Sequence, residues 1–169
     1  MNILSGRFKR ASIKTTRKLS YRPTKSLVRK SIFDSLNLFN FDSVCDLFSG
    51  TGIIGFESAS RGAKSITFVE NDYKTIRLIQ DNAQTLEGPN YKFFQKDVFS
   101  FLKNCNSYDL IYADPPYGKY DSAPLVRSVL KHLNKHGILF LECDKNQTPF
   151  LDSVVRDYGQ TRILKWENR

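Results

Sequence analysis

The stretch that decides the fold is DLFSGTGIIG, residues 46–55. The apolar run Val44–Phe48 is typical of a buried strand, and the following Ile53–Ser60 has the composition of a helix. The glycines therefore lie where a strand ends and a helix begins. Such a junction is the first unit of an alternating strand and helix fold.

The glycines of this stretch indicate a site for a nucleoside. Gly50, Gly52 and Gly55 satisfy the spacing G-x-G-x-x-G, which permits a tight turn and brings backbone N–H groups close to a ligand. Glu70 ends the next apolar segment, where an acid can accept hydrogen bonds from ribose hydroxyls. A plain strand-to-helix turn would explain one or two glycines but not the paired acid.

Asp46, just before the glycine loop, discriminates between cofactors. A carboxylate there would repel a pyrophosphate but could hold the amino group of a methionine moiety, so we expect S-adenosylmethionine rather than NAD. Asp97 either lies near the adenine amino group or caps a helix that starts at Val98, and the residues leave both roles open. The expected cofactor residues lie at strand ends and are Asp46, Phe48, Ser49, Gly50, Gly52, Glu70, Asn71, Asp97 and Asp114.

Strand-like and helix-like segments alternate through most of the chain. The expected strands are Val44–Phe48, Ser65–Glu70, Tyr91–Gln95, Leu110–Ala113 and Gly137–Glu142. The expected helices are residues 24–38 with Thr24 as N-cap, Ile53–Ser60, Tyr73–Thr85, Val98–Asn104, Pro124–Leu133 and a short one near Phe150. This alternation predicts an α/β, doubly wound and mostly parallel sheet. Ser153–Tyr158 and Thr161–Trp166 then predict a C-terminal antiparallel hairpin.

The motif Asp114-Pro115-Pro116-Tyr117 follows the fourth expected strand. Its prolines fix the backbone, so that carbonyl oxygens not used by a helix point into the cleft. An exocyclic amine on a base is a poor nucleophile, and hydrogen bonds from it to the Asp114 carboxylate and the Pro115 carbonyl would support the positive charge that develops on methyl transfer. Tyr117 could stack on the base. A rigid turn with a surface tyrosine is the structural alternative.

Positive charge is concentrated at the N-terminus. The net charge is +9, and residues 1–33 hold ten Lys or Arg and no acidic residue. Residues 1–23 are therefore predicted to be a basic RNA-binding arm, which could form a β-hairpin, ahead of a methyltransferase domain at 24–169. Binding of such an arm to RNA releases counterions from the phosphates, which favours association. The expected RNA-binding residues are Arg7, Lys9, Arg10, Lys14, Arg17, Lys18 and Arg22. A merely solvated, solubilising face is the alternative.

Other features exclude several classes of protein. There is no apolar segment of signal-peptide or membrane-spanning length, and the three cysteines do not suggest disulfides. We therefore expect a cytoplasmic protein that needs no membrane. His132 and His136 have the spacing of a helical metal pair but no third ligand nearby, so we place them at a helix C-terminus and expect no metal.

Four segments together resemble the bacterial ribosomal RNA small-subunit methyltransferase D family. They are DLFSGTGIIGFESASRGA from Asp46, VEND at residues 69–72, ADPPYGK at residues 113–119, and the arm sequence ILSGRFKRASIK with the later YRPTKSLVRKSIFDSL. The resemblance implies a seven-stranded Rossmann-like class I fold and N2-methylation of a guanine in 16S ribosomal RNA with S-adenosylmethionine. It further implies a monomer acting on RNA in an assembling small subunit.

The resemblance also assigns residues. It gives cofactor roles to Asp46, Gly50, Gly52, Glu70 and Asp97, and catalytic roles to Asp114, Pro115 and Tyr117. It also gives Arg22-Pro23-Thr24 a place near the cofactor or RNA. From the motif itself we add Pro116 to the expected catalytic residues. Three other functions stay open at this stage. They are a methyltransferase acting on adenine in DNA or RNA or on a protein amide, a nicotinamide oxidoreductase, and a simple RNA-binding module without a cofactor.

Overall fold

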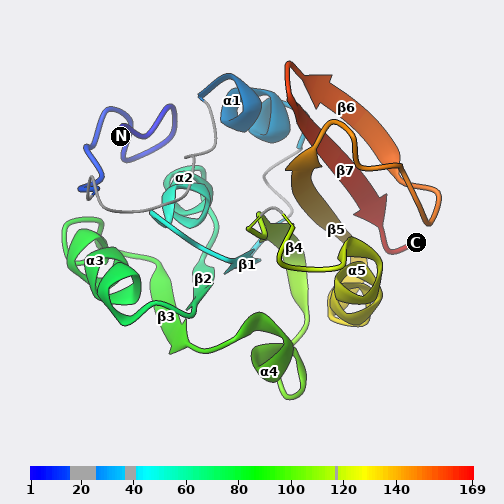
Figure 1. Cartoon of the computed structure of the whole chain (residues 1–169). Helices are drawn as coiled ribbons and strands as arrows, with labels where there is room; N and C mark the ends of the chain where they lie inside the picture. The colour runs from blue at the N-terminus through cyan, green and yellow to red at the C-terminus, as the bar shows by residue number, and fades with distance from the viewer. Residues whose placement is uncertain (16–25, 37–40, 117) are drawn as a thin grey trace.

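The computed structural model describes residues 1–15, 26–36, 41–116 and 118–169. A seven-stranded sheet with the order β3-β2-β1-β4-β5-β7-β6 forms its centre (Figure 1). The strands are β1 (Ser43–Leu47), β2 (Ser65–Glu70), β3 (Asn90–Gln95), β4 (Tyr108–Ala113), β5 (Leu133–Asp144), β6 (Val154–Tyr158) and β7 (Thr161–Glu167). The pairs among β1–β5 are parallel, and β7 pairs antiparallel with both β5 and β6. The predicted doubly wound sheet and its terminal hairpin are thus confirmed.

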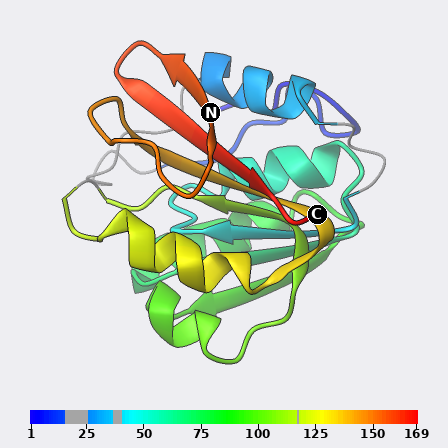
Figure 2. The ribbon, with the colours of Figure 1, turned by 90° about the vertical axis from the view of Figure 1, so that its right-hand side faces the viewer.

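Helices cover both faces of the sheet. On one face lie α1 (Ser26–Asp34), α2 (Ile53–Ser60) and α3 (Tyr73–Ala83), and on the other α4 (Val98–Leu102) and α5 (Ser122–Leu130) (Figures 1 and 2). Each face has its own core: Phe56 and Phe68 belong to the first, and Leu125 and Leu139 belong to the second. The inner strands β1, β2 and β4 are mostly buried on both sides, which explains why they read as continuous apolar runs.

The strand order places a ligand site. β1 lies between β2 and β4, so the chain leaves β1 toward one edge of the sheet and returns at β4 to build the other. At such a switch point the loops after the two strands diverge and leave a crevice outside their carboxyl ends. The glycine loop follows β1, and the Asp-Pro-Pro motif follows β4.

The sequence-based boundaries fail around α5. Asp121 caps this helix by accepting from the Ala123 N–H at 3.2 Å, and the helix ends at Leu130. β5 already begins at Leu133 and contains His136, whose φ is 62°. The expected helix C-terminal position of His136 is therefore wrong, because Leu133 pairs with β4 instead of extending the helix. Gly137, the first residue of the expected strand, lies inside β5, which begins earlier.

Two smaller expectations also differ. No helix forms near Phe150, where the chain makes a turn closed by the Ser153 N–H to the Phe150 carbonyl at 3.2 Å. The first helix ends at Asp34 rather than residue 38, and the expected cap Thr24 lies outside the described residues. Within the described ranges, no helix has the length and apolar character needed to cross a membrane.

The first 15 residues pack against α2 and α3. They form an irregular hairpin with a single bridge between Asn2 and Ser12. The Glu57 carboxylate of α2 accepts from the Leu4 and Ser5 N–H groups at 2.8 and 3.2 Å. Ile3 is only 2% exposed. This part of the basic arm is therefore built into the folded body, and the division of the chain at residue 23 stays a prediction.

Candidate active site

Four carboxylic acids form a row across the carboxyl ends of neighbouring strands. In spatial order they are Glu70 on β2, Asp46 on β1, Asp114 just after β4 and Glu142 on β5. Side chains alternate between faces along a strand, and residues two positions earlier, such as Phe68, Val44 and Tyr112, belong to the core beneath α1–α3. The four acids therefore share that face of the sheet and concentrate negative charge and hydrogen-bond acceptors at its rim.

Asp46 lies on β1, and its side chain is held against the start of α2. It is 2% exposed, and its Oδ2 accepts from the Gly55 N–H at 3.0 Å. Burial raises the pKa of the Asp46 carboxyl well above its usual range; the Gly55 N–H opposes this, and the Glu70 charge adds to it. A cationic group bound beside Asp46 would relieve this unfavourable burial of negative charge.

Gly55 is needed because α2 lies very close to β2. A Cβ at this position would be 2.3 Å from Cε1 of Phe68 and 2.9 Å from Cγ2 of Ile66. Real carbon atoms do not approach so closely, so glycine is required for this packing. The third glycine of the motif thus brings the N-terminus of α2 against the sheet beside Asp46.

Glu70 ties the glycine loop to the loop after β2. Its Oε2 accepts from the Gly50 N–H at 3.1 Å and its Oε1 from the Asp72 N–H at 3.0 Å. The Ser49 hydroxyl donates to the Asp46 carbonyl at 2.6 Å and accepts from the Val69 N–H at 2.9 Å. These bonds fix both loops in advance of any ligand. The exposed Asn71 lies between Glu70 and Asp72, and the cofactor contacts expected of Ser49 and Asn71 stay predictions.

Asp114 stands in a different environment. None of the described residues donates a hydrogen bond to its carboxylate, while burial and the neighbouring Glu142 and Asp46 charges raise its pKa well above the usual range. Pro115 is buried, and the carbonyl of the exposed Pro116 accepts from the Lys119 N–H at 3.2 Å. Tyr117, the fourth residue of the motif, lies outside the described residues. That the Asp114 carboxylate accepts from a bound ligand stays a prediction.

Sequence reasoning missed Glu142. It is 5% exposed, and the buried Tyr112 hydroxyl donates a hydrogen bond to its Oε2. Tyr112 lies two residues before Asp114 on the same face of β4, so Glu142 extends the row of acids by one strand. The signal was present in the sequence, since an acid ends the apolar run 138–141 as Glu70 ends its own strand.

An aromatic group beside the row was also missed. The Tyr120 ring contacts the Phe48 ring edge-on at 4.9 Å and stacks with Phe99 at 6.0 Å between centroids. Burial and the adjacent Asp97 carboxylate raise the pKa of the Tyr120 hydroxyl. Asp97 caps α4 by accepting from the Ser100 N–H at 3.0 Å. The structural role that the sequence left open for Asp97 is therefore real, and its cofactor role stays a prediction.

Four of the seven arm residues expected to bind RNA lie within the described part of the chain. Arg7, Lys9, Arg10 and Lys14 are exposed on the hairpin that packs on α2 and α3; Arg17, Lys18 and Arg22 lie outside the described residues. In the part of the chain that the structure describes, no group of three His, Cys, Asp or Glu side chains is arranged to hold a metal ion.

The sheet order, the C-terminal hairpin and the position of the glycine loop define the class I methyltransferase fold. A solved protein of Thermus thermophilus, described as hypothetical protein TTHA0928, is 26% identical and superposes with a TM-score of 0.87 over 98% of both chains. The T. thermophilus 16S rRNA N2 G1207 methyltransferase RsmC, solved with AdoMet and guanosine, gives a TM-score of 0.74 over 90% of this chain and 45% of that one. At 18% identity, this second likeness shows the fold alone.

The sequence model of the family described as conserved hypothetical protein 95 matches residues 1–164, and the chain belongs to this family. YlbH of Bacillus subtilis is 31% identical over 170 residues, which cover 96% of this chain and 91% of that one. The ribosomal RNA small subunit methyltransferase D of Buchnera aphidicola subsp. Acyrthosiphon pisum is 29% identical over 155 residues, covering 86% and 79%. The resemblance to methyltransferase D proteins is thereby confirmed.

Proposed function

We propose that this protein transfers a methyl group from S-adenosylmethionine to the exocyclic N2 of a guanine in 16S ribosomal RNA. The observation that carries the proposal is the row of four acids, in which Asp46 and Glu70 flank a preformed glycine loop while Asp114 accepts no hydrogen bond from the described residues. One half of the row suits a nucleoside cofactor and the other half suits an amine. Relatives named ribosomal RNA small subunit methyltransferase D support the substrate class.

The chain's own residues fit the cofactor in this proposal. Asp46 is a buried acid without a cationic partner among the described residues, so it suits the ammonium group of the methionine moiety. Glu70, at the end of β2, suits the ribose hydroxyls, and Phe48 and Asp97 border the space for the adenine ring. Bound S-adenosylmethionine would supply a sulfonium methyl group, which is electrophilic and has a good leaving group.

Asp114 and Pro115 would act on the base. Acceptor oxygens of the carboxylate and the carbonyl hold the two N–H groups of N2, so that its lone pair points at the methyl carbon. As the methyl group passes to N2, its bond to sulfur would break and S-adenosylhomocysteine would be the leaving group, while the Asp114 carboxylate would stabilise the positive charge gained by N2. The raised pKa of Asp114 also suits this group to take the N2 proton and pass it to solvent. No covalent enzyme intermediate is needed.

The RNA is held, in this proposal, by the exposed cations of residues 1–15 together with the later cations of the arm. We further propose that a monomer acts on RNA in an assembling small subunit. Initial rates on protein-free 16S RNA and on partly assembled subunits, compared with each other, test the form of the substrate. Light scattering gives the molar mass of the free enzyme and tests the monomer.

Isothermal titration with S-adenosylhomocysteine and, separately, with NADH tests the cofactor assignment. Binding of S-adenosylhomocysteine alone supports the methyltransferase function, whereas binding of NADH alone overturns it. Mass spectrometry of nucleosides from 16S RNA incubated with the enzyme and labelled S-adenosylmethionine then tests the target atom. Labelled N2-methylguanosine is expected. Labelled N6-methyladenosine would show that the target is adenine, and label only in protein would show that the target is a protein amide; either result would overturn the guanine-N2 assignment.

A further inference from the structure

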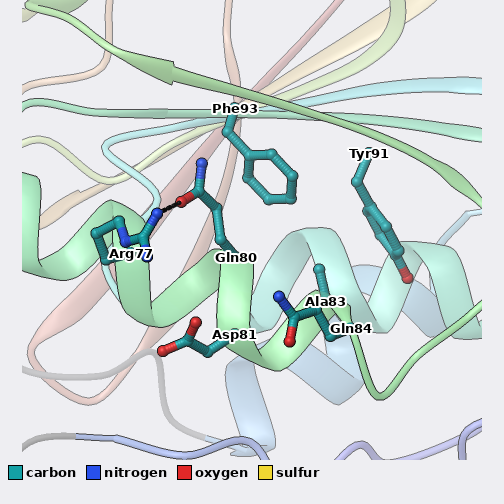
Figure 3. Close-up of a pocket in the computed structure, with 7 residues that line it drawn as sticks. All are labelled: Arg77, Gln80, Asp81, Ala83, Gln84, Tyr91 and Phe93. Atoms are coloured by element: carbon teal, nitrogen blue, oxygen red, sulfur yellow. Dashed lines mark hydrogen bonds between the residues drawn. The ribbon is translucent and has the colours of Figure 1, made fainter.

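A second groove lies at the edge of the sheet, apart from the row of acids. It runs between α3 and the edge strand β3 and has a volume of about 400 Å³. Two rings of β3, Tyr91 and Phe93, form its apolar wall, and the side chains of Arg77, Gln80 and Gln84 reach it from α3 (Figure 3). This volume falls in the range of sites that hold small organic groups.

The two rings are fixed in position. Phe93 stacks on the buried Phe68 with 5.7 Å between centroids and 8° between planes. The Tyr91 hydroxyl donates to the Leu86 carbonyl at 2.8 Å. Both rings are only half-buried, so part of each remains open to the groove. Rings that are already immobilised lose little conformational entropy when a flat ligand stacks on them.

The polar wall can hydrogen-bond to the edge of a base. The amides of Gln80 and Gln84 each carry donors and an acceptor, and the Arg77 guanidinium adds donors. Arg77 Nη1 contacts Gln80 Oε1 at the long distance of 3.4 Å. Asp81 is the acidic side chain among the described lining residues, and Figure 3 draws it on the side of α3 away from the two rings.

A cation of the N-terminal hairpin, Arg7, is fixed beside this groove, and the hairpin is also anchored at Lys14. The Arg7 guanidinium donates to the Glu87 carbonyl just ahead of β3 and lies close enough to Tyr91 to lower the pKa of its hydroxyl, against the larger effect of burial. Lys14 is anchored through its backbone, whose N–H and carbonyl both bond to the Asn82 side chain at 3.0 Å. The groove therefore has a hairpin cation near Tyr91 and the Arg77 guanidinium on α3.

We propose that this groove binds an unpaired nucleotide of the substrate RNA, at a site separate from the methylated base. The proposal rests on the function proposed above for the choice of RNA. Immobilised aromatic rings next to fixed cations are the features that hold single-stranded RNA, since each base can stack while phosphates meet positive charge. The same cations would repel a basic protein segment, so charge complementarity favours RNA as the occupant.

The test adds negative charge to the groove without removing any packed atom. The double variant Gln80→Glu and Gln84→Glu is compared with Asn146→Asp and Gln160→Glu, which makes the same chemical change at exposed positions near the opposite edge of the sheet. The probe is protein-free 16S RNA, with a labelled oligouridine as a second ligand, and binding is measured without cofactor. We expect the groove variant to bind both about tenfold more weakly and the control to bind normally.

The outcomes separate this proposal from the proposed function. Equal RNA affinity in the two double variants, whether normal or reduced, would overturn the groove assignment. Titration with S-adenosylhomocysteine checks that each variant is folded, and failure of the wild type to bind it would count against the proposed function alone. A photoreactive residue at Gln84 gives an independent readout: cross-linking to RNA supports the proposal, and cross-linking only to protein in small subunits refutes it.

Discussion

The loop after β1 and the segment after β4 face the same crevice but are built in opposite ways. The glycine loop is closed by the protein's own hydrogen bonds, including those from Gly50 to Glu70 and from Gly55 to Asp46. After β4, Asp114 receives no hydrogen bond from the described residues, and two prolines have no N–H to donate. The first loop is preorganised around internal partners, whereas in the second the Asp114 carboxylate has no hydrogen-bond donor among the described residues.

This difference suits two ligands that have different roles in the catalytic cycle. A cofactor is the same in every cycle, so a loop held rigid in its bound form avoids an ordering cost each time. A base must enter, react and leave, so its acceptors are left to the substrate. The contrast predicts that substitutions in the glycine loop and its partners weaken cofactor binding, whereas substitutions in the segment after β4 slow methyl transfer.

The largest effect is expected from Asp114→Ala. Removing the carboxylate takes away the group that stabilises charge on the amine, so methyl transfer should fall about 100- to 1000-fold, while affinity for S-adenosylhomocysteine is largely retained. Single-turnover transfer to 16S RNA and calorimetry measure the two quantities. Asp114→Asn keeps one acceptor oxygen, so its rate of methyl transfer should lie between those of Asp114→Ala and the wild type. Loss of both activities in a protein with a normal circular dichroism spectrum would contradict the division of labour.

The converse effect is expected from Glu70→Gln. The two carboxylate oxygens accept from two different N–H groups, and an amide nitrogen would face one of those donors. Affinity for S-adenosylhomocysteine should fall about ten- to hundredfold, whereas transfer at saturating cofactor should change much less. Asp121→Asn removes an equal charge at the cap of α5 and should leave the affinity unchanged. A Glu70 variant with normal affinity would show that the loop needs no such tie.

Gly55→Ala should affect stability before chemistry. The added methyl group meets the Phe68 ring at 2.3 Å, and relieving the clash should cost about 1–3 kcal/mol in the free energy of unfolding. Urea denaturation measures the loss. Adding Phe68→Leu should make the double variant more stable than the sum of the two single changes. Strict additivity would mean that the contact between α2 and β2 is not the reason for glycine here.

The smallest effect is the pH dependence of stability caused by Asp46. Because its pKa is raised in the folded state, the native protein holds this proton more tightly than the unfolded chain. Stability is therefore lost as pH rises above the ordinary value of 3.8 toward the raised one. Asp46→Asn keeps an acceptor for Gly55 and removes this loss, so its stability relative to the wild type should increase as the pH is raised from about 4 toward neutral.

Denaturation midpoints of both proteins across that range test the Asp46 prediction. The same variant should bind S-adenosylhomocysteine about tenfold more weakly, because the neutral amide no longer attracts a cationic group. A constant stability difference at all pH values would show that Asp46 is not the group responsible.

Much of the architecture could be predicted because local patterns agreed with it. Ile53–Ser60 was placed correctly, since glycines mark its start and its apolar residues are buried throughout. β5 was cut short because the glycine at 137 outweighed Leu133, whose pairing with β4 is a tertiary contact that no local pattern contains. Tyr120 was missed for the same reason, because its importance comes from Phe48 and Phe99 on other segments. Glu142, by contrast, follows an apolar run as Glu70 does and could have been recognised from the sequence.

Phe48 shows where this crevice departs from maximal stability. It adopts φ 56°, a left-handed conformation in which a large side chain is unfavourable. Its ring meanwhile contacts Tyr120 at the edge of the crevice. In a laboratory evolution experiment that selects only for heat resistance, this position should drift toward glycine or asparagine. Selection for methylation in the same library should keep the aromatic ring. Opposite preferences in the two selections would show that Phe48 is retained for activity at the expense of stability.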